Sequence, residues 1–156
     1  MQAVYLETSI FGYLASRTSA DLITAGNQRL TMQWWDNHRN QFDLFVSQAV
    51  IAECRAGDSI AADERLAFLE DLPILDIDDE TRQLAKTILA DVPLPTNADV
   101  DALHIAVAAM SGMDYLLTWN CKHIANPSLR RIIDDVLLAA DVVPPIICTP
   151  QELINV

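Results

Sequence analysis

Short apolar runs alternate along this chain with longer segments of helical periodicity, and this alternation limits the possible folds more than any other feature. The expected strands are Val4 to Leu6, Phe42 to Val46, Pro73 to Leu75, Tyr115 to Leu117 and Pro145 to Cys148. Strands that are separated by helices favour a parallel sheet with helices on both faces. We therefore predict a three-layer α/β domain with a central, mainly parallel sheet of four to five strands.

The expected helices begin at capping residues and end near glycine or proline. Their ranges are 9–14, 21–38, 48–56, 58–70, 78–91, a helix from Asn97 or Asp99 to Met110, and 127–140. Ser9 and Ser47 are predicted to cap two of them, because serine side chains accept hydrogen bonds from the free N–H groups of a first turn. Gly57 is predicted to end the third helix, since glycine tolerates a positive φ.

The length and composition indicate one globular domain. The chain has 156 residues, 51% of them hydrophobic, and no repeat or linker divides it, so we expect a single domain over residues 1–156. No apolar run approaches the ~20 residues that a membrane helix needs, and no signal-peptide pattern is present. The three cysteines are scattered, which suggests neither a disulfide framework nor a zinc site. A cytoplasmic location is the expectation.

The charge balance is strongly acidic. Asp and Glu number 22 against 10 Lys plus Arg, for a formal net charge of −12. This argues against a broad basic footprint for a phosphate backbone. A divalent cation held by acids in a pocket would invert the local field. Most of the acids are expected to solvate helix faces.

Four polar residues follow strands or open helices at the carboxyl ends of the predicted sheet, where open parallel sheets form their sites. Glu7 comes directly after the first strand, and Glu53 lies two turns into the helix after the second. Asp101 lies in the first turn of a later helix, and Asn120 follows the strand in "YLLT". Carboxylate and amide oxygens suit Mg²⁺ or Mn²⁺ better than zinc.

Each of these residues also has a structural interpretation. Glu7 could be the solvated end of a strand, Asp101 could complement a helix dipole, and Asn120 could serve turn chemistry. Glu53 lies among apolar neighbours in "AVIAEC", where an unpaired charge would be costly. Taken as a set of four, they favour a metal site. For Asn120 the functional and structural interpretations are nearly equal.

Several stretches resemble the PIN domain family, especially the VapC-like ribonuclease toxins of bacterial toxin–antitoxin pairs. They are "VYLETS", "SQAVIAE", "DALHIAVAAMSGMDYLLTWN" and "CKHI". The resemblance implies a metal-dependent endoribonuclease with an RNA substrate, a cognate antitoxin and Mg²⁺ or Mn²⁺ as cofactor. The family's acidic and polar positions fall on Glu7, Glu53, Asp101 and Asn120. We also expect a homodimer.

The chain departs from the family at two of these positions. Glu7 stands where the family usually has Asp, and Asn120 stands where Asp is frequent. Metal binding is therefore expected to depend on Glu7, Glu53 and Asp101, with Asn120 orienting water or phosphate. Asp99 precedes Asp101 by two residues, which is about 200° round a helix. Asp99 is thus predicted to cap the helix or to bind a second ion.

Other polar residues near these positions are candidates for auxiliary roles. Thr8 and Ser9 are expected to offer a hydroxyl or N–H group beside the metal, and Arg17 is expected to supply a positive charge near Glu7. Lys122 and His123 are expected to contact substrate phosphate. His104 is predicted to be a packed or hydrogen-bonded histidine. Asp114 precedes a strand at the opposite edge of the sheet, so we predict a structural role for it.

The predicted reaction is metal-assisted hydrolysis of an RNA phosphodiester, leaving 5′-phosphate and 3′-hydroxyl ends. The alternative is a weakened or inactive PIN-like module that binds a protein partner, which the Glu7 and Asn120 changes and the net acidity would favour. Exposed tryptophans in "MQWW" would mark such a surface, although core packing is the commoner role. A phosphatase ranks lower, because no D-x-D follows the first strand.

Overall fold

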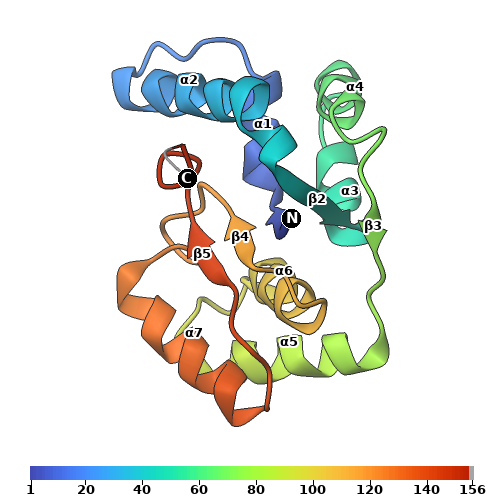
Figure 1. Cartoon of the computed structure of the whole chain (residues 1–156), viewed down its shortest axis with the longest axis vertical. Coiled ribbons are helices and arrows are strands. Elements are labelled where there is room, and N and C mark those ends of the chain that lie inside the picture. The colour runs from blue at the N-terminus through green and yellow to red at the C-terminus, as the bar shows by residue number, and fades with distance from the viewer. Residues whose placement is uncertain (155–156) are drawn as a thin grey trace.

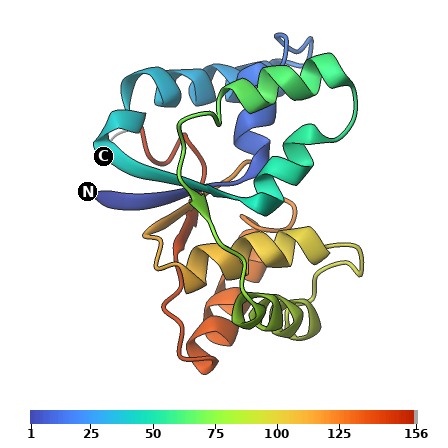
Figure 2. The same ribbon diagram turned by 90° about the vertical axis from the view of Figure 1, so that its right-hand side faces the viewer.

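The sheet has β1 at its centre and carries helices on both faces (Figures 1 and 2). This computed structural model describes residues 1–154. Five strands pair in the order β3-β2-β1-β4-β5, and every pairing is parallel. The strands are β1 (Gln2–Leu6), β2 (Phe42–Ser47), β3 (Ile74–Leu75), β4 (Tyr115–Leu117) and β5 (Ile146–Cys148). The predicted parallel α/β sheet is confirmed.

The helices form two layers. α1, α2 and α4 lie on one side of the sheet, while α5, α6 and α7 lie on the other (Figure 2). α3 contacts both α1 and α4. Their bounds are α1 (Thr8–Ala15), α2 (Leu22–Asn37), α3 (Gln48–Arg55), α4 (Ser59–Ala67), α5 (Asp79–Asp91), α6 (Asp99–Met110) and α7 (Pro127–Ala139). A short 3-10 helix, Arg39–Gln41, joins α2 to β2 and was not predicted.

The core lies on both faces of the central strand. Val4, Tyr5 and Leu6 are fully buried, as expected of a strand with helices on each side. α6 is buried on most of its surface, because α5 packs against it on the side away from the sheet. The strand that precedes Glu7 is therefore held by buried contacts on both of its faces.

Two of the predicted helix caps differ in the structure. Glu7, rather than Ser9, is the N-cap of α1, and its side chain accepts the N–H of Ser9. Ser47 occupies the N-cap position of α3 but makes no side-chain capping bond. Its hydroxyl contacts Tyr5 instead, because the end of β2 lies beside β1. Gly57 has a φ of 85°, as predicted for the residue that follows a helix.

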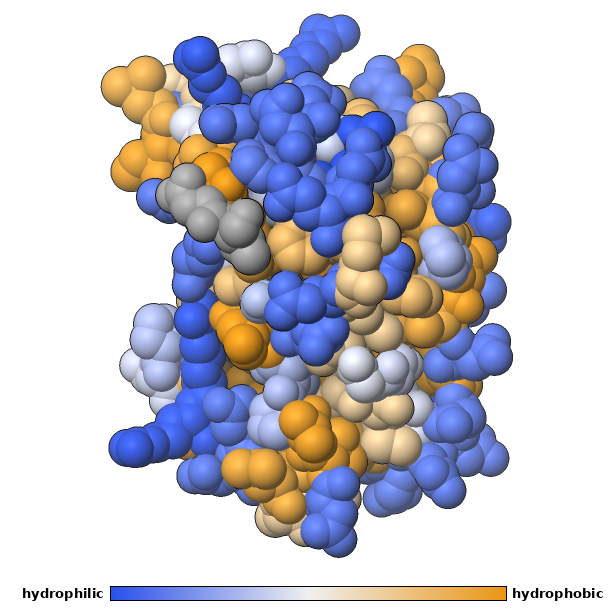
Figure 3. Space-filling view, in the orientation of Figure 1, coloured by the Kyte–Doolittle hydropathy of each residue, from blue (hydrophilic) through white to orange (hydrophobic). Residues whose placement is uncertain are grey.

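The tryptophans of "MQWW" belong mainly to the interior. Trp34 is fully buried, and Trp35 packs edge-on against Phe11 and Phe68. Elsewhere, hydrophilic side chains cover most of the face in Figure 3, with hydrophobic ones in scattered patches. No helix within residues 1–154 has the length and apolar character required to cross a membrane.

Neighbouring leucines of α7 offer a matched test of the core. Leu137 is fully buried, whereas Leu138 is 58% exposed. Leu137→Ala should lower the free energy of unfolding by about 2–5 kcal/mol, because it leaves a cavity. Leu138→Ala should change it by less than about 0.5 kcal/mol. Urea denaturation measures both, and equal losses would contradict the placement of α7.

Candidate metal centre

The carboxyl ends of three neighbouring strands bring the candidate residues to one edge of the sheet. Glu7 follows β1, and Glu53 lies near the end of α3, which starts directly after β2. Asn120 lies three residues beyond the end of β4, and Asp101 lies in the first turn of α6. The parallel sheet thus gathers residues that are far apart in sequence, in the manner general to open α/β sheets.

The Glu7 carboxylate is buried and held by three donors. Its Oε1 accepts hydrogen bonds from the hydroxyls of Ser9, at 2.5 Å, and Thr118, at 2.6 Å. Its Oε2 accepts only the backbone N–H of Ser9, at 3.1 Å. The side chain is 5% exposed, so these donors replace much of the water that the charge would otherwise bind. The Oε2 atom keeps capacity to accept a further partner.

The Glu53 carboxylate is arranged in the same manner. Its Oε1 lies 2.5 Å from the Thr8 hydroxyl and 2.5 Å from Nε2 of His104. No hydrogen bond to Oε2 is found within residues 1–154. Burial raises the pKa of Glu53, but the hydrogen bond and charge of His104 and the Thr8 hydrogen bond outweigh it, so the net pKa is lowered. Glu53 is therefore held as a carboxylate with one oxygen available.

His104 lies between Glu53 and the core. Its side chain is fully buried, and its Nδ1 is 2.7 Å from the Tyr5 hydroxyl, which is 2.8 Å from the Ser47 hydroxyl. Burial, above all, raises the pKa of Tyr5 far above its usual value. The prediction of a hydrogen-bonded His104 is confirmed. Glu7, Glu53 and His104 each offer a ligand atom within 4.8 Å of the others.

Asp101 belongs to an adjoining cluster. Its Oδ1 accepts from the Asn120 amide at 3.2 Å, and its Oδ2 lies 2.7 Å from Nδ1 of His123. The Asn120 side-chain oxygen accepts the backbone N–H of His123. Thr118 joins the two clusters, because its hydroxyl donates to Glu7 and accepts the Asn120 N–H at 2.9 Å. Asp101 is thus connected to Glu7 by three hydrogen bonds, through Asn120 and Thr118.

The remaining auxiliary candidates differ in their surroundings. Thr8 and Ser9 contact the carboxylates directly through their hydroxyls. Lys122 and Arg17 are exposed, and neither forms an ion pair within the described part of the chain. Asp99 is the exposed first residue of α6, where Ala98 is the cap. The capping role predicted for Asp99 is therefore wrong, because Asp99 is already inside the helix and Ala98 occupies the N-cap position.

Asp114 has the structural role predicted for it. It lies just before β4, at the edge of the sheet opposite the carboxylates, and its Oδ2 accepts the Ala3 N–H at 2.7 Å. Thr118, Tyr5 and Ser47 were not predicted as parts of the site. One signal was available for Thr118, because it directly follows β4 just as Glu7 directly follows β1.

The donor set fits a hard divalent cation. Glu53 receives its protein donors on Oε1, and Glu7 receives two donors on Oε1 and one on Oε2, so the Oε2 atom of each keeps spare acceptor capacity. Carboxylates that ligate metals are themselves hydrogen-bonded in this way. Oxygen ligands of this kind suit Mg²⁺ or Mn²⁺. The same arrangement would leave two like charges close together without a cation.

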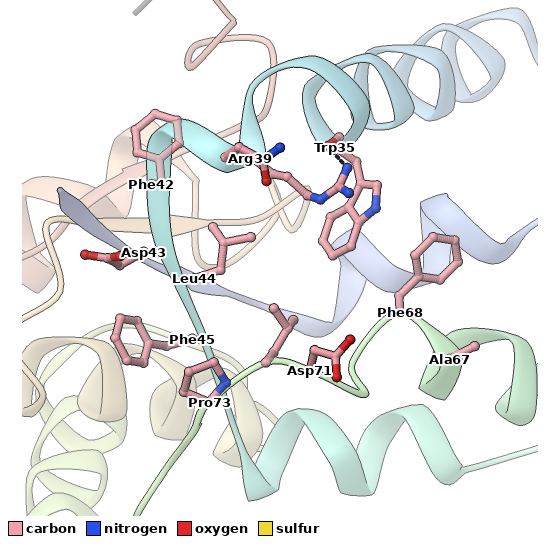
Figure 4. Close-up of a pocket in the computed structure, with 12 residues that line it drawn as sticks. Trp35, Arg39, Phe42, Asp43, Leu44, Phe45, Ala67, Phe68, Asp71 and Pro73 are labelled. Carbon is pink, nitrogen blue, oxygen red and sulfur yellow. Dashed lines mark hydrogen bonds between the residues drawn. The ribbon is translucent and has the colours of Figure 1, made fainter.

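A larger cavity lies elsewhere, at the outer edge of β2. It has a volume of about 560 Å³ and is lined by Trp35, Arg39, Leu44, Phe68 and Asp71 among others (Figure 4). Beside it, β2 pairs with β3 only at Val46 and Ser47. None of the predicted site residues lines this cavity. The carboxylates therefore lie in a part of the molecule that is separate from this cavity.

Comparisons with known proteins give a family match and structures of similar fold. The PIN domain model matches residues 4–120. VapC20 of Mycobacterium tuberculosis, a toxin that cleaves the sarcin–ricin loop, has a similar structure at 17% identity, with a TM-score of 0.62 over 80% of this chain and 95% of that one. VapBC2 from Rickettsia felis, solved with a fragment of its promoter DNA, is similar at 18% identity, with a TM-score of 0.55 over 95% of this chain and 98% of that one. A search of curated proteins found no match.

The lowered pKa of Glu53 predicts an acid-dependent contribution to stability. A carboxylate with a lower pKa in the folded state stabilises the fold above its ordinary value of 4.5, and the contribution is lost as the pH falls through the folded value. Glu53→Gln should therefore flatten the fall in stability of the metal-free protein below about pH 4.5. Glu64→Gln, at an exposed position of α4, should leave that fall unchanged. Thermal melts across this range in EDTA measure the difference.

Proposed function

Because the chain belongs to the PIN domain family, we propose that it is a metal-dependent endoribonuclease and the toxin of a type II toxin–antitoxin pair. The observation that carries this proposal is the Glu7–Glu53 pair, whose ligand atoms lie within 4.8 Å at the carboxyl edge of the sheet. Each carboxylate is fixed mainly through Oε1 and keeps acceptor capacity on Oε2. The likeness to VapC20 and VapBC2 supports the same assignment.

The proposed metal ligands are Glu7, Glu53 and Asp101, and the proposed ion is Mg²⁺ or Mn²⁺. When bound, such an ion supplies a water of lowered pKa and neutralises charge on the phosphate oxygens. Thr8, Ser9 and Thr118 hold the Glu7 and Glu53 carboxylates in place. Asn120 and His123 do the same for Asp101. The three proposed ligand side chains are therefore held in position by hydrogen bonds before any ion binds.

Lys122 and His123 are proposed to bind the phosphate groups of the substrate. Lys122 is exposed next to the Asp101 cluster, and His123 uses only Nδ1 for Asp101, so both can contact a phosphate oxygen. In the proposed hydrolysis the oxygen of a water would bond to phosphorus as the bond to the 3′-oxygen breaks, and a proton from solvent would complete the 3′-hydroxyl, which leaves 5′-phosphate and 3′-hydroxyl ends. A carboxylate that is not fully committed to the metal, Asp99 or Glu7, takes the proton of that water.

The proposed partners are RNA, a cognate antitoxin and a second copy of the chain, and the proposed location is the cytoplasm. The VapBC2 structure, which resembles this fold over 95% of the chain, supports an antitoxin partner. The cavity at the β2 edge is separate from the carboxylates, so a partner could bind there without contacting the proposed ligands. A purely non-catalytic module is less favoured, because the hydroxyl donors around Glu7 and Glu53 suit working metal ligands.

Removal of single carboxylate charges tests the proposed site. Glu53→Gln and Asp101→Asn should each reduce Mn²⁺-dependent RNA cleavage by at least about 100-fold, since even groups behind metal ligands are worth about 10–100-fold. Glu64→Gln on α4 is the matched control and should cleave at the wild-type rate. Cleavage of a labelled RNA, with and without EDTA, provides the measurement. Full activity in either site variant would show that the ligands lie elsewhere.

The length of the Glu7 side chain can be tested separately. Glu7→Asp draws the carboxylate back by one methylene, so it cannot keep the Thr118 and Ser9 bonds and also reach the position of Oε2. We expect Mn²⁺ to bind about 10–100-fold more weakly, as when a group that supports a metal ligand is lost. Calorimetric titration measures the affinity. Tighter binding by the shorter acid would mean that the backbone of Glu7 lies closer to the ion than proposed.

A further inference from the structure

A buried chain of hydrogen bonds runs from the core to the Glu53 carboxylate. It passes from the Ser47 hydroxyl to the Tyr5 hydroxyl at 2.8 Å, then to His104 Nδ1 at 2.7 Å, and from His104 Nε2 to Glu53 Oε1 at 2.5 Å. Ser47, Tyr5 and His104 are each fully buried. The four residues come from β2, β1, α6 and α3, so the chain connects four elements of the fold.

The hydrogen atoms of this chain can be assigned from the chemistry of its groups. Glu53 is a carboxylate, which only accepts, so His104 must present an N–H from Nε2. In the neutral imidazole Nδ1 then accepts from the Tyr5 hydroxyl, which keeps its proton because burial raises its pKa. Ser47 completes the chain by donating to the Tyr5 oxygen. A protonated His104 would still present Nε2–H to Glu53, so this contact is the same in both forms.

This contact determines which Glu53 oxygen is available. Oε1 receives both the His104 and the Thr8 donors, which leaves Oε2 for a further partner. The Glu53 side chain is 38% exposed, so without these donors it could adopt other rotamers in solvent. His104 cannot move easily in turn, because it is fully buried and its ring is held by Tyr5.

We propose that His104, fixed by Tyr5 and Ser47, is a positioning residue that aims Glu53 Oε2 at the metal and is not itself a ligand. The inference rests on the proposed metal site but not on RNA cleavage. His104 lies within ligand distance of Glu7 and Glu53. Its Nε2, however, is already hydrogen-bonded to Oε1 at 2.5 Å, and coordination would break that bond and strip Glu53 of a donor.

Mn²⁺ affinity tests the positioning role without any assay of RNA cleavage. His104→Leu removes the donor but fills the space, and should weaken Mn²⁺ binding by about 10–100-fold. His104→Gln restores an N–H near the position of Nε2 and should recover part of that loss, which a mere packing role would not allow. Tyr5→Phe should weaken binding by a smaller factor. Tyr115→Phe is the matched control, because the Tyr115 hydroxyl contacts only Gln2.

Isothermal titration of each folded variant, checked by circular dichroism, gives these affinities. Wild-type affinity in both His104→Leu and Tyr5→Phe would overturn the positioning role alone. A wild-type protein that binds no Mn²⁺ would overturn this inference together with the proposed metal site.

Pulsed electron paramagnetic resonance distinguishes positioning from ligation. A coordinated imidazole nitrogen couples strongly to Mn²⁺, and labelling histidine with ¹⁵N changes that signal. The proposal predicts no strong histidine coupling in wild-type protein. His123→Ala serves as the control for the other histidine of the site, since His123 contacts Asp101. A strong coupling that disappears in His104→Gln and persists in His123→Ala would make His104 a ligand and overturn the proposal.

Discussion

The register between β1 and β4 is the constraint on which the site depends. Leu6 lies opposite Leu117, so Glu7 and Thr118 leave the sheet side by side. This placement lets the Thr118 hydroxyl donate to Glu7 while its oxygen accepts the Asn120 N–H. A slip of one residue would turn these side chains to opposite faces. The buried strand β1 therefore fixes the position of the carboxylate and its link to Asp101 at the same time.

Apart from His104, the groups that hold the Glu7 and Glu53 carboxylates are neutral hydroxyl and backbone N–H donors. Thr8, Ser9 and Thr118 supply the hydroxyls, and no Lys or Arg contacts Glu7 or Glu53 within residues 1–154. Hydroxyl donors hold a carboxylate without neutralising it, so the negative potential needed to attract a cation is kept. A lysine or arginine in the same place would have competed with the metal. In the proposed function, a divalent ion bound at these carboxylates would allow an acidic protein to bind RNA, which is itself negatively charged.

Much of the fold could be predicted from the sequence, because strands and helices alternate with clear boundaries. Asp58, Asp78 and Gly57 mark helix ends through local chemistry. Glu7, Glu53, Asp101 and Asn120 could be placed at one edge because they follow strands or open helices at the carboxyl ends of a parallel sheet, and their roles remain predictions. The Tyr5–His104–Glu53 chain could not be predicted, because it joins three separate elements and depends on which face of α6 is turned to β1. Periodicity places a residue on a face, but it does not name the partner across the interface.

The proposed function depends on a divalent ion held by Glu7, Glu53 and Asp101. The most direct measurement is a crystal structure grown with Mn²⁺, in which anomalous scattering locates the ion independently of the surrounding atoms. We expect a peak bonded to Glu7 Oε2, Glu53 Oε2 and a carboxylate oxygen of Asp101, with the Thr118 and His104 hydrogen bonds retained. A peak bonded to His104 Nε2, or no peak at this edge of the sheet, would contradict it.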